Sequence, residues 1–237
     1  VMVKGIGGYH LACDATRADA VDALRVLKGR ESKPFAVMFR TMDAVDAHCM
    51  TDDAERALLQ APERPIVLLK RLATSAIAAN VYGTSPMLGA FLPYTPLQAL
   101  LLAGMGPLVM TSSNSSGLPI LMEDGEALRF AAEREQCVGV LYHDRPILRR
   151  VDDSVAMVVN RRTMLLRRSR GYVPLPLPFV GANSPALLAL GAQQKSTICL
   201  SAGGQMYPST EIGDLDNLET MAVYHDTVRD MQALLAI

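Results

Sequence analysis

The chain of 237 residues contains no tryptophan, and its aromatic content is only 5%. Proteins that bind single-stranded nucleic acid stack bases on aromatic side chains, so this shortage disfavours a dedicated single-strand binder. The chain also lacks an excess of positive charge, because 23 basic and 24 acidic residues give a formal net charge of −1. A charge this close to zero gives no support to bulk electrostatic binding of nucleic acid or of a membrane.

Cysteines are few and lie far apart, without any Cys-x-x-Cys pair: Cys13, Cys49, Cys137 and Cys199. This pattern predicts neither a zinc site nor a disulfide framework, and it suits the reducing conditions of the cytoplasm. No signal peptide or apolar run of about 18 residues is present, so we expect no membrane partner. The first residues resemble the middle of a strand and the last ones the middle of a helix, which predicts a fragment of a longer protein.

The chain does contain apolar runs and helix-start signals, within a composition of 50% hydrophobic and 20% charged residues that is typical of globular proteins. Strands are predicted over residues 1–3, 35–39, 66–69, 107–110, 138–142, 154–159 and 163–168. Helices are predicted over residues 123–136 and behind the N-cap candidates Thr16, Thr41, Thr51 and Thr95. Residues 71–94 show no clear period and are expected to be irregular. This order predicts an α/β (α+β) fold, with helices packed on a mixed sheet.

The composition changes between residues 174 and 185, where four prolines accompany glycine, asparagine and serine. Such a segment is typical of a linker, so we place a domain boundary near residue 182. Beyond it, strands are predicted over residues 187–190, 197–201 and 205–207, and a helix over 215–235. The second piece is short for a domain that is stable by itself, and we expect it to be the start of a truncated one.

Three cations lie within six residues, just before the strand predicted over residues 35–39: Lys28, Arg30 and Lys33. One interpretation is a solvated helix end, where the helix dipole favours cations. The other is a phosphate site, because Gly29 lies between the cations at the helix exit and Pro34 fixes the entry into the strand. That arrangement would direct the three side chains to one point beyond the edge of the sheet.

A polar, hydroxyl-rich turn at residues 111–117 follows directly after another apolar run. Serine-rich turns are common hydrogen-bonded connectors, which is the alternative to a binding role. In an open α/β sheet, however, ligands bind in the loops that leave strand ends, and fixed cations bind phosphate oxygens strongly. Together with the cations, Thr111, Ser112 and Asn114 therefore predict a nucleotide site, although no Walker loop is present.

Two more basic segments are candidates for phosphate contacts. Arg150 adjoins Asp152 and Ser154, which form either a surface ion-pair patch of little energetic value or a place where arginine meets phosphate and Asp152 holds Mg²⁺. Arg168 and Arg170 lie at a strand end, where they could serve recognition of phosphate, carboxylate or nucleic acid.

The four histidines are isolated in the sequence, and no order of Ser, His and Asp convincingly indicates a catalytic triad. His10 lies in the glycine-rich first loop and is the best candidate among them for a substrate contact. Because that loop lacks the spacing of a dinucleotide fingerprint, no dinucleotide is expected.

The pairs Lys28-x-Arg30 and Ser112-x-Asn114 resemble motifs of YrdC-like domains, which make carbamoyl-adenylates from ATP. Longer segments resemble the HypF family, the carbamoyltransferases of [NiFe]-hydrogenase maturation: residues 4–15, 33–38, 92–96 and 167–174. The tail, at residues 190–195 and 212–220, resembles the opening of that family's Kae-type ATPase-like domain. The resemblance implies a YrdC-like twisted open mixed sheet at residues 1–182 and the truncated start of an ASKHA-type carbamoyl-transfer domain at 183–237.

The resemblance implies that carbamate, derived from carbamoyl phosphate, attacks ATP to give carbamoyl-adenylate and pyrophosphate. The carbamoyl group would pass to the C-terminal cysteine of HypE and become the cyanide ligand of the hydrogenase. ATP would be a substrate together with Mg²⁺, and zinc is not expected in this part of the family's sequence. Two alternatives stay open: a threonylcarbamoyl-adenylate synthase of tRNA modification, and an RNA-binding YrdC-like module.

Residue roles follow from the same resemblance. Lys28 and Arg30 are assigned as catalytic residues at the α-phosphate and carbamate, and Lys33 to the pyrophosphate side. Ribose and phosphate contacts are assigned to Thr111, Ser112 and Asn114. The second-rank phosphate contacts are Arg150, Ser154, Arg168 and Arg170.

Lys4 and His10 are assigned to the substrate pocket. Lys4, Gly5 and Gly7 occupy positions where the related tRNA-modifying enzymes carry a Pro-Thr loop that handles L-threonine. Without threonine hydroxyls at these positions, free carbamate is favoured as the acyl substrate.

Overall fold

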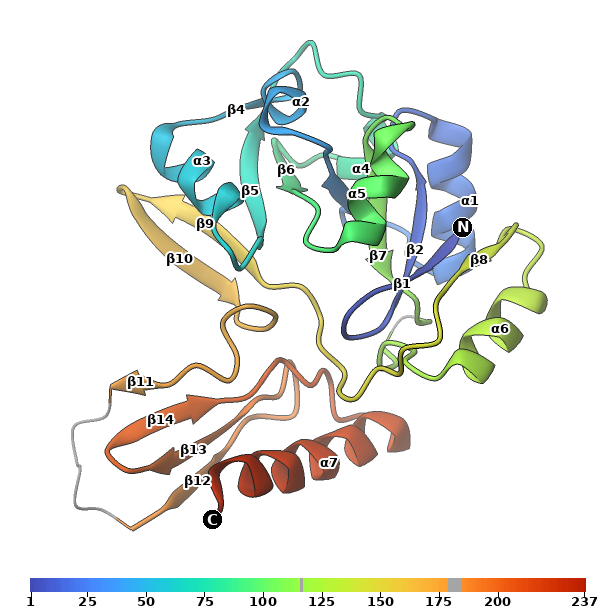
Figure 1. Ribbon diagram of the computed structural model, residues 1–237. Helices are drawn as coiled ribbons and strands as arrows, with labels where there is room; N and C mark the ends of the chain where they lie inside the picture. The colour runs from blue at the N-terminus through green and yellow to red at the C-terminus, as the bar shows by residue number, and fades with distance from the viewer. Residues whose placement is uncertain (116, 179–184) are drawn as a thin grey trace.

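The computed structural model describes residues 1–115, 117–178 and 185–237 (Figure 1). Its main body is a mixed sheet of ten strands in the order β10-β9-β5-β6-β3-β7-β2-β1-β8, with β4 paired to β5. The strands are β1 (Met2–Lys4), β2 (Tyr9–Asp14), β3 (Ala36–Met38), β4 (Cys49–Met50), β5 (Ile66–Arg71), β6 (Met87–Phe91), β7 (Leu108–Ser112), β8 (Val140–Leu141), β9 (Val155–Val159) and β10 (Arg162–Arg167).

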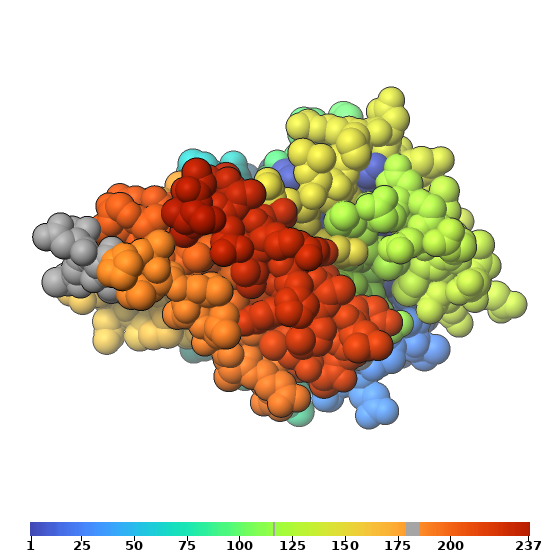
Figure 2. Space-filling model, turned by 90° about the horizontal axis from the view of Figure 1, so that it is seen from below, coloured from blue at the N-terminus to red at the C-terminus, as the bar shows by residue number. Residues whose placement is uncertain are grey.

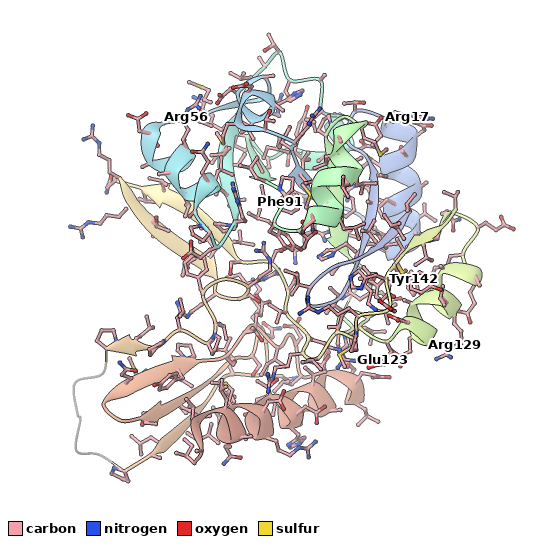
Figure 3. All side chains as sticks on the ribbon, viewed as in Figure 1. Arg17, Arg56, Phe91, Glu123, Arg129 and Tyr142 are labelled. Carbon is pink, nitrogen blue, oxygen red and sulfur yellow. The ribbon has the colours of Figure 1, made fainter. Side chains whose placement is uncertain are left out.

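Helices cover both faces of this sheet. Successive strand residues point to opposite sides, so each face presents apolar side chains for helices to pack on. The helices are α1 (Ala18–Lys28), α2 (Met42–Asp46), α3 (Asp53–Gln60), α4 (Ala79–Tyr82), α5 (Pro96–Ala103) and α6 (Asp124–Ala132). In β3, Val37 packs in the large core with α1, α2, α3, α4 and α6, whereas Met38 packs in a smaller core with Leu102 of α5. Phe91 belongs to that smaller core and lies beside α5 in Figure 3.

A second body follows, a four-stranded antiparallel sheet in the order β11-β14-β13-β12 with one long helix. Its elements are β11 (Leu177–Pro178), β12 (Leu187–Leu190), β13 (Ile198–Ala202), β14 (Gln205–Pro208) and α7 (Leu218–Leu235). Ile198 and Leu200 of β13 pack against Met231 of α7. The boundary expected near residue 182 lies outside the described residues, and β11, which precedes it, already pairs with β14.

Two of the four predicted N-caps are confirmed. Thr41 accepts a hydrogen bond from the backbone N–H of Ala44 at the start of α2. Thr95 caps α5 within a capping box, in which the Gln98 side chain accepts a hydrogen bond from the N-cap backbone, and Pro96 occupies the first turn.

The other two N-cap predictions are wrong, in each case because an aspartate accepts the hydroxyl's hydrogen bond. The Thr16 hydroxyl donates to Asp14 Oδ1, and α1 begins after Arg17, which makes no side-chain capping bond. The Thr51 hydroxyl donates to Asp46, and the next residue, Asp52, caps α3 instead.

The prediction that residues 71–94 are irregular is wrong for residues 79–82, which form α4, and for residues 87–91, which form β6 between β3 and β5. Gly89 hides this strand from a pattern search, since it contributes no side chain to a hydrophobic period. The space at this position is tight, because a Cβ there would lie 3.1 Å from the Ile66 side chain and 3.5 Å from that of Ala36.

No helix within residues 1–115, 117–178 and 185–237 combines the length and the apolar character that crossing a bilayer requires.

The loop between β1 and β2 is pressed against the chain at Val151, whose N–H donates to the carbonyl of Gly7 at 3.0 Å. A Cβ at Gly7 would lie 2.4 Å from the Val151 carbonyl oxygen and 2.6 Å from its nitrogen. We therefore expect Gly7→Ala to lower the free energy of unfolding by about 1–3 kcal/mol in urea titrations. Gly106→Ala is the matched control, because the space around Gly106 is open. Equal stability of the two variants would contradict this packing.

Candidate functional site

A cavity of about 1500 Å³ lies between the main sheet and the second body. The cavity wall on the main body includes Lys28, Arg30 and Ser112, and the opposite wall includes Glu211 and Asp230. In the space-filling view from below, the second body (orange to red) lies across the main body (Figure 2). The volume exceeds the roughly 300–1,000 Å³ of a typical drug-sized pocket, so a nucleotide and a second small substrate can share it.

One buried lysine joins the two segments that sequence reasoning selected. Lys28, the last residue of α1, is only 4% exposed. Its Nζ donates to the backbone carbonyl of Ser112, at the end of β7, and to Asn114 Oδ1 at 2.7 Å. The Ser112 hydroxyl donates to the same Asn114 oxygen at 2.8 Å. The lysine-arginine segment and the serine-asparagine turn therefore meet at one wall of the cavity.

The ammonium group of Lys28 is held at a high electrostatic cost. Burial, together with the neighbouring cations Arg30 and Lys33, lowers its pKa from 10.5 to about 7, although Asp152 acts in the opposite direction. Both of its hydrogen-bond acceptors are neutral oxygens. An anion placed in the cavity would therefore favour the charged form of this lysine.

Arg30 and Lys33 extend the positive wall. The Arg30 side chain donates to the Thr111 hydroxyl at 3.5 Å and to the carbonyl of Lys33 at 3.1 Å, and its guanidinium carbon lies 4.7 Å from the centre of the Phe35 ring. Burial, together with the charges of Arg25 and Arg167, lowers the pKa of Arg30 to about 10. The pKa of Lys33, a partly covered surface residue, is also lowered, first by partial desolvation and then by Arg30 and Arg167. This mutual repulsion makes the wall a strong attractor for phosphate.

Arg167 is a cavity residue that the sequence reasoning left out of its assignments. Its Nη1 pairs with Asp152 at 2.9 Å, and its Nε pairs with Glu211 of the second body at 2.8 Å. Burial acts to lower the pKa of Arg167, but the two carboxylates raise it overall. Arg167 is the last residue of β10, and Arg168 follows it directly. Because successive residues of a strand point to opposite faces of the sheet, this alternation could have indicated that only one of the two side chains faces the cavity.

Arg150 and Asp152 both line the cavity, as predicted from the sequence. The Arg150 Nε donates to the carbonyl of Ile120 at 3.1 Å, which leaves the end of its guanidinium available. Asp152 accepts from Arg167 through one oxygen and from the N–H of Asp153 through the other. Within the described part of the chain, no cluster of three or more His, Cys, Asp or Glu side chains could hold a metal ion. In this arrangement both oxygens of Asp152 accept hydrogen bonds from the protein, and its role as a Mg²⁺ ligand stays a prediction.

The structure places Arg170 outside the cavity, in a buried hydrogen-bond network. Its Nη2 pairs with Asp153 at 2.9 Å, and its side chain donates to the carbonyls of Glu63 and Arg64 at 2.8 and 2.9 Å. The guanidinium carbon lies 3.5 Å from the centre of the Tyr94 ring. Arg170 therefore ties the turn after β10 to the segments that precede β5 and β9, away from the cavity lining.

Ser154 and Arg168 also lie outside the cavity lining. The Ser154 hydroxyl donates to the carbonyl of Arg170 at 2.9 Å and accepts from the N–H of Ser169 at 2.8 Å. The Arg168 side chain donates to the carbonyl of Leu175 at 2.7 Å. Both side chains shape the turn after β10, which is a structural role.

Lys4 and His10, assigned above to the substrate pocket, are likewise absent from the cavity wall. Lys4 Nζ pairs with Asp124 Oδ1 at 2.6 Å and donates to the carbonyl of His143 at 2.8 Å, which ties β1 to α6. His10 is buried, with Nε2 at 3.6 Å from Asp153 Oδ2. Both residues therefore contribute to packing behind the site.

Comparison with known proteins agrees with this geometry. Residues 1–169 match the Sua5/YciO/YrdC family model, whose description is telomere recombination. This chain belongs to the Sua5/YciO/YrdC family. Residues 182–237 match a second model, the HypF Kae1-like domain.

The chain is similar over nearly its whole length to curated HypF proteins. It is 37% identical over 237 residues to carbamoyltransferase HypF of Synechocystis, covering 99% of this chain and 30% of the relative. It is 43% identical over 235 residues to carbamoyltransferase HypF of Rhodobacter capsulatus, covering 98% and 31%. The chain thus spans about a third of the length of these relatives.

A solved structure supports the same relationship. The crystal structure of full-length HypF in the phosphate- and nucleotide-bound form superposes with a TM-score of 0.93 at 36% identity, over 100% of this chain and 37% of that one. The predicted mixed α/β fold and the predicted resemblance to HypF are therefore confirmed.

The lowered pKa of Lys28 predicts a pH dependence of stability. Between about pH 7 and the ordinary lysine value of 10.5, the unfolded chain binds more protons than the folded chain, so the Lys28 contribution to the free energy of unfolding rises with pH. We expect wild type to gain stability relative to Lys28→Met as the pH is raised from about 7 to about 9, in paired urea titrations. Parallel pH profiles of the two proteins would show that Lys28 is not held in this way.

Proposed function

We propose that this chain activates carbamate with ATP to form carbamoyl-adenylate, as one part of a carbamoyltransferase of hydrogenase maturation. The observation that carries the proposal is the meeting of Lys28 with Ser112 and Asn114 at a cavity lined by Arg30 and Lys33. The names of the curated relatives support carbamoyl transfer, and the nucleotide-bound form of a similar structure supports ATP as a substrate.

In the proposed reaction, a carbamate oxygen attacks the α-phosphorus of ATP. A new oxygen–phosphorus bond forms, the bond between the α-phosphorus and the bridging oxygen breaks, and pyrophosphate leaves with that oxygen. Both reactants are anions, and negative charge builds on the phosphate oxygens during the step. Fixed cations lower this barrier because they are already oriented before charge develops. Lys28 and Arg30 would act at the α-phosphate and carbamate, and Lys33 at the pyrophosphate.

The turn after β7 would hold the nucleotide. Thr111, Ser112 and Asn114 line the cavity beside Lys28, so they would be placed to contact a ribose or an α-phosphate. Arg150 lines the same cavity and provides one more phosphate donor. Mg²⁺ would arrive with ATP as part of the substrate.

The second body supports a role in the following transfer. Its residues 209–214 and α7 form the cavity wall that faces the cations, so the adenylate would form within reach of this body. We propose that residues 1–182 make the adenylate and that residues 183–237 begin the domain that passes the carbamoyl group to HypE. Carbamoyl phosphate would supply the carbamate, and the four free cysteines suit a reducing, cytoplasmic setting.

We expect Lys28→Ala and Arg30→Ala each to lower carbamate-dependent ATP–pyrophosphate exchange by about 10²–10³-fold, because each removes one preorganised cation. The assay uses labelled pyrophosphate, with bicarbonate and ammonia or carbamoyl phosphate as the carbamate source. Arg17→Ala is the control, since the Arg17 side chain is 65% exposed, does not line the cavity and lies at the opposite end of α1 from Lys28.

Near-normal exchange in both variants, with far-ultraviolet circular dichroism showing a folded chain, would refute the assigned roles. Incorporation of added L-threonine into the product would instead select a threonylcarbamoyl-adenylate synthase. Salt-dependent RNA affinity without nucleotide turnover would select an RNA-binding module.

A further inference from the structure

The loop that carries two of the site cations has little support from its own backbone. Gly29 adopts a left-handed conformation at φ +60° and ends α1, and the N–H of Arg30 donates to the carbonyl of Arg25 at 3.1 Å. Within the described structure, residues 31–34 make no backbone–backbone hydrogen bond, and their side chains are exposed. If the cations of this segment are to keep a fixed position, other parts of the protein must hold its backbone in place.

Arg25 supplies this support from the last turn of α1. Its Nη1 donates to three carbonyls of the loop, those of Arg30 at 2.9 Å, Glu31 at 3.1 Å and Lys33 at 3.3 Å. Its Nε donates to the carbonyl of Asn80 in α4 at 2.9 Å. One guanidinium group therefore ties the loop to two helices of the main body.

The ring of Phe35 completes the arrangement. The guanidinium carbons of Arg25 and Arg30 each lie 4.7 Å from its centre, and the ring is only 2% exposed. Arg25 itself does not line the cavity. Its charge lowers the pKa of Arg30, so its electrostatic effect on the neighbouring cation is unfavourable. The role of Arg25 is therefore to shape the loop rather than to bind the ligand.

We propose that Arg25 is a positioning residue for the phosphate-binding cations: its planar fork fixes the loop carbonyls so that Arg30 and Lys33 face the cavity. The catalytic part of this inference rests on the proposed function. Lysine cannot replace arginine here, because an ammonium group has neither the fork that spans the loop and α4 nor the plane that packs on Phe35.

The test compares Arg25→Lys and Arg25→Ala with Arg17→Lys as a matched control in the 237-residue chain. Amide hydrogen exchange in residues 29–34 is measured first, because it does not depend on any assigned activity. We expect faster amide hydrogen exchange in this segment in both Arg25 variants, with unchanged hydrogen exchange in β7.

The second readout is kinetic. If the cations are held less firmly, kcat for ATP–pyrophosphate exchange should fall by about 10- to 100-fold and the KM for ATP should rise. Added guanidinium ion should restore part of the kcat of Arg25→Ala.

Unchanged hydrogen exchange in residues 29–34 of both Arg25 variants would overturn the proposal. Loss of activity that guanidinium fails to restore, accompanied by faster exchange across the whole chain, would also overturn it, because Arg25 would then serve general stability. If wild type shows no ATP–pyrophosphate exchange while Arg25→Lys still loosens residues 29–34 alone, the proposed function fails and the positioning of the loop is supported.

Discussion

The contact of the buried Lys28 ammonium with the Ser112 carbonyl and the Asn114 amide organises the site. It joins the end of α1 to the end of β7, across more than eighty residues of sequence, and it does so with neutral acceptors. The cost is visible in the pKa of Lys28, lowered to about 7 by burial and by neighbouring cations. Such an arrangement is stabilised when an anion enters, which is why the same interaction that shapes the cavity also predicts what the cavity binds.

The second body gives the cavity a wall of opposite charge. Arg167 connects the two bodies, since it pairs with Asp152 on one side and with Glu211 on the other. A second ion pair crosses between Arg149 and Asp230 of α7. The exposed Arg149–Asp230 pair contributes little stability by itself, but the pairs of Arg149 and Arg167 set cations and carboxylates on facing walls. Under the proposed function, a negatively charged nucleotide would be attracted to the cationic wall, and the adenylate formed there would face the second body.

Sequence patterns were sufficient where local chemistry decides the outcome, and insufficient where distant contacts do. The capping signals of Thr41 and Thr95 predicted helix starts correctly, whereas Asp14 and Asp46 diverted the hydroxyls of two other candidates. The cationic loop and the serine-asparagine turn were found from residue type and position. The burial of Arg170 against Asp153 and Tyr94, and the use of Lys4 in pairing with Asp124, depend on segments far apart in sequence, which no local pattern shows.

The most direct measurement is a crystal structure of the chain soaked with ATP, bicarbonate and ammonia. We expect electron density for a nucleotide in the shared cavity, with the α-phosphate within hydrogen-bond distance of Lys28 Nζ and the Arg30 guanidinium. We also expect the turn after β7 to contact the ribose. A nucleotide bound elsewhere, or one that leaves Lys28 bonded only to Ser112 and Asn114, would contradict the account.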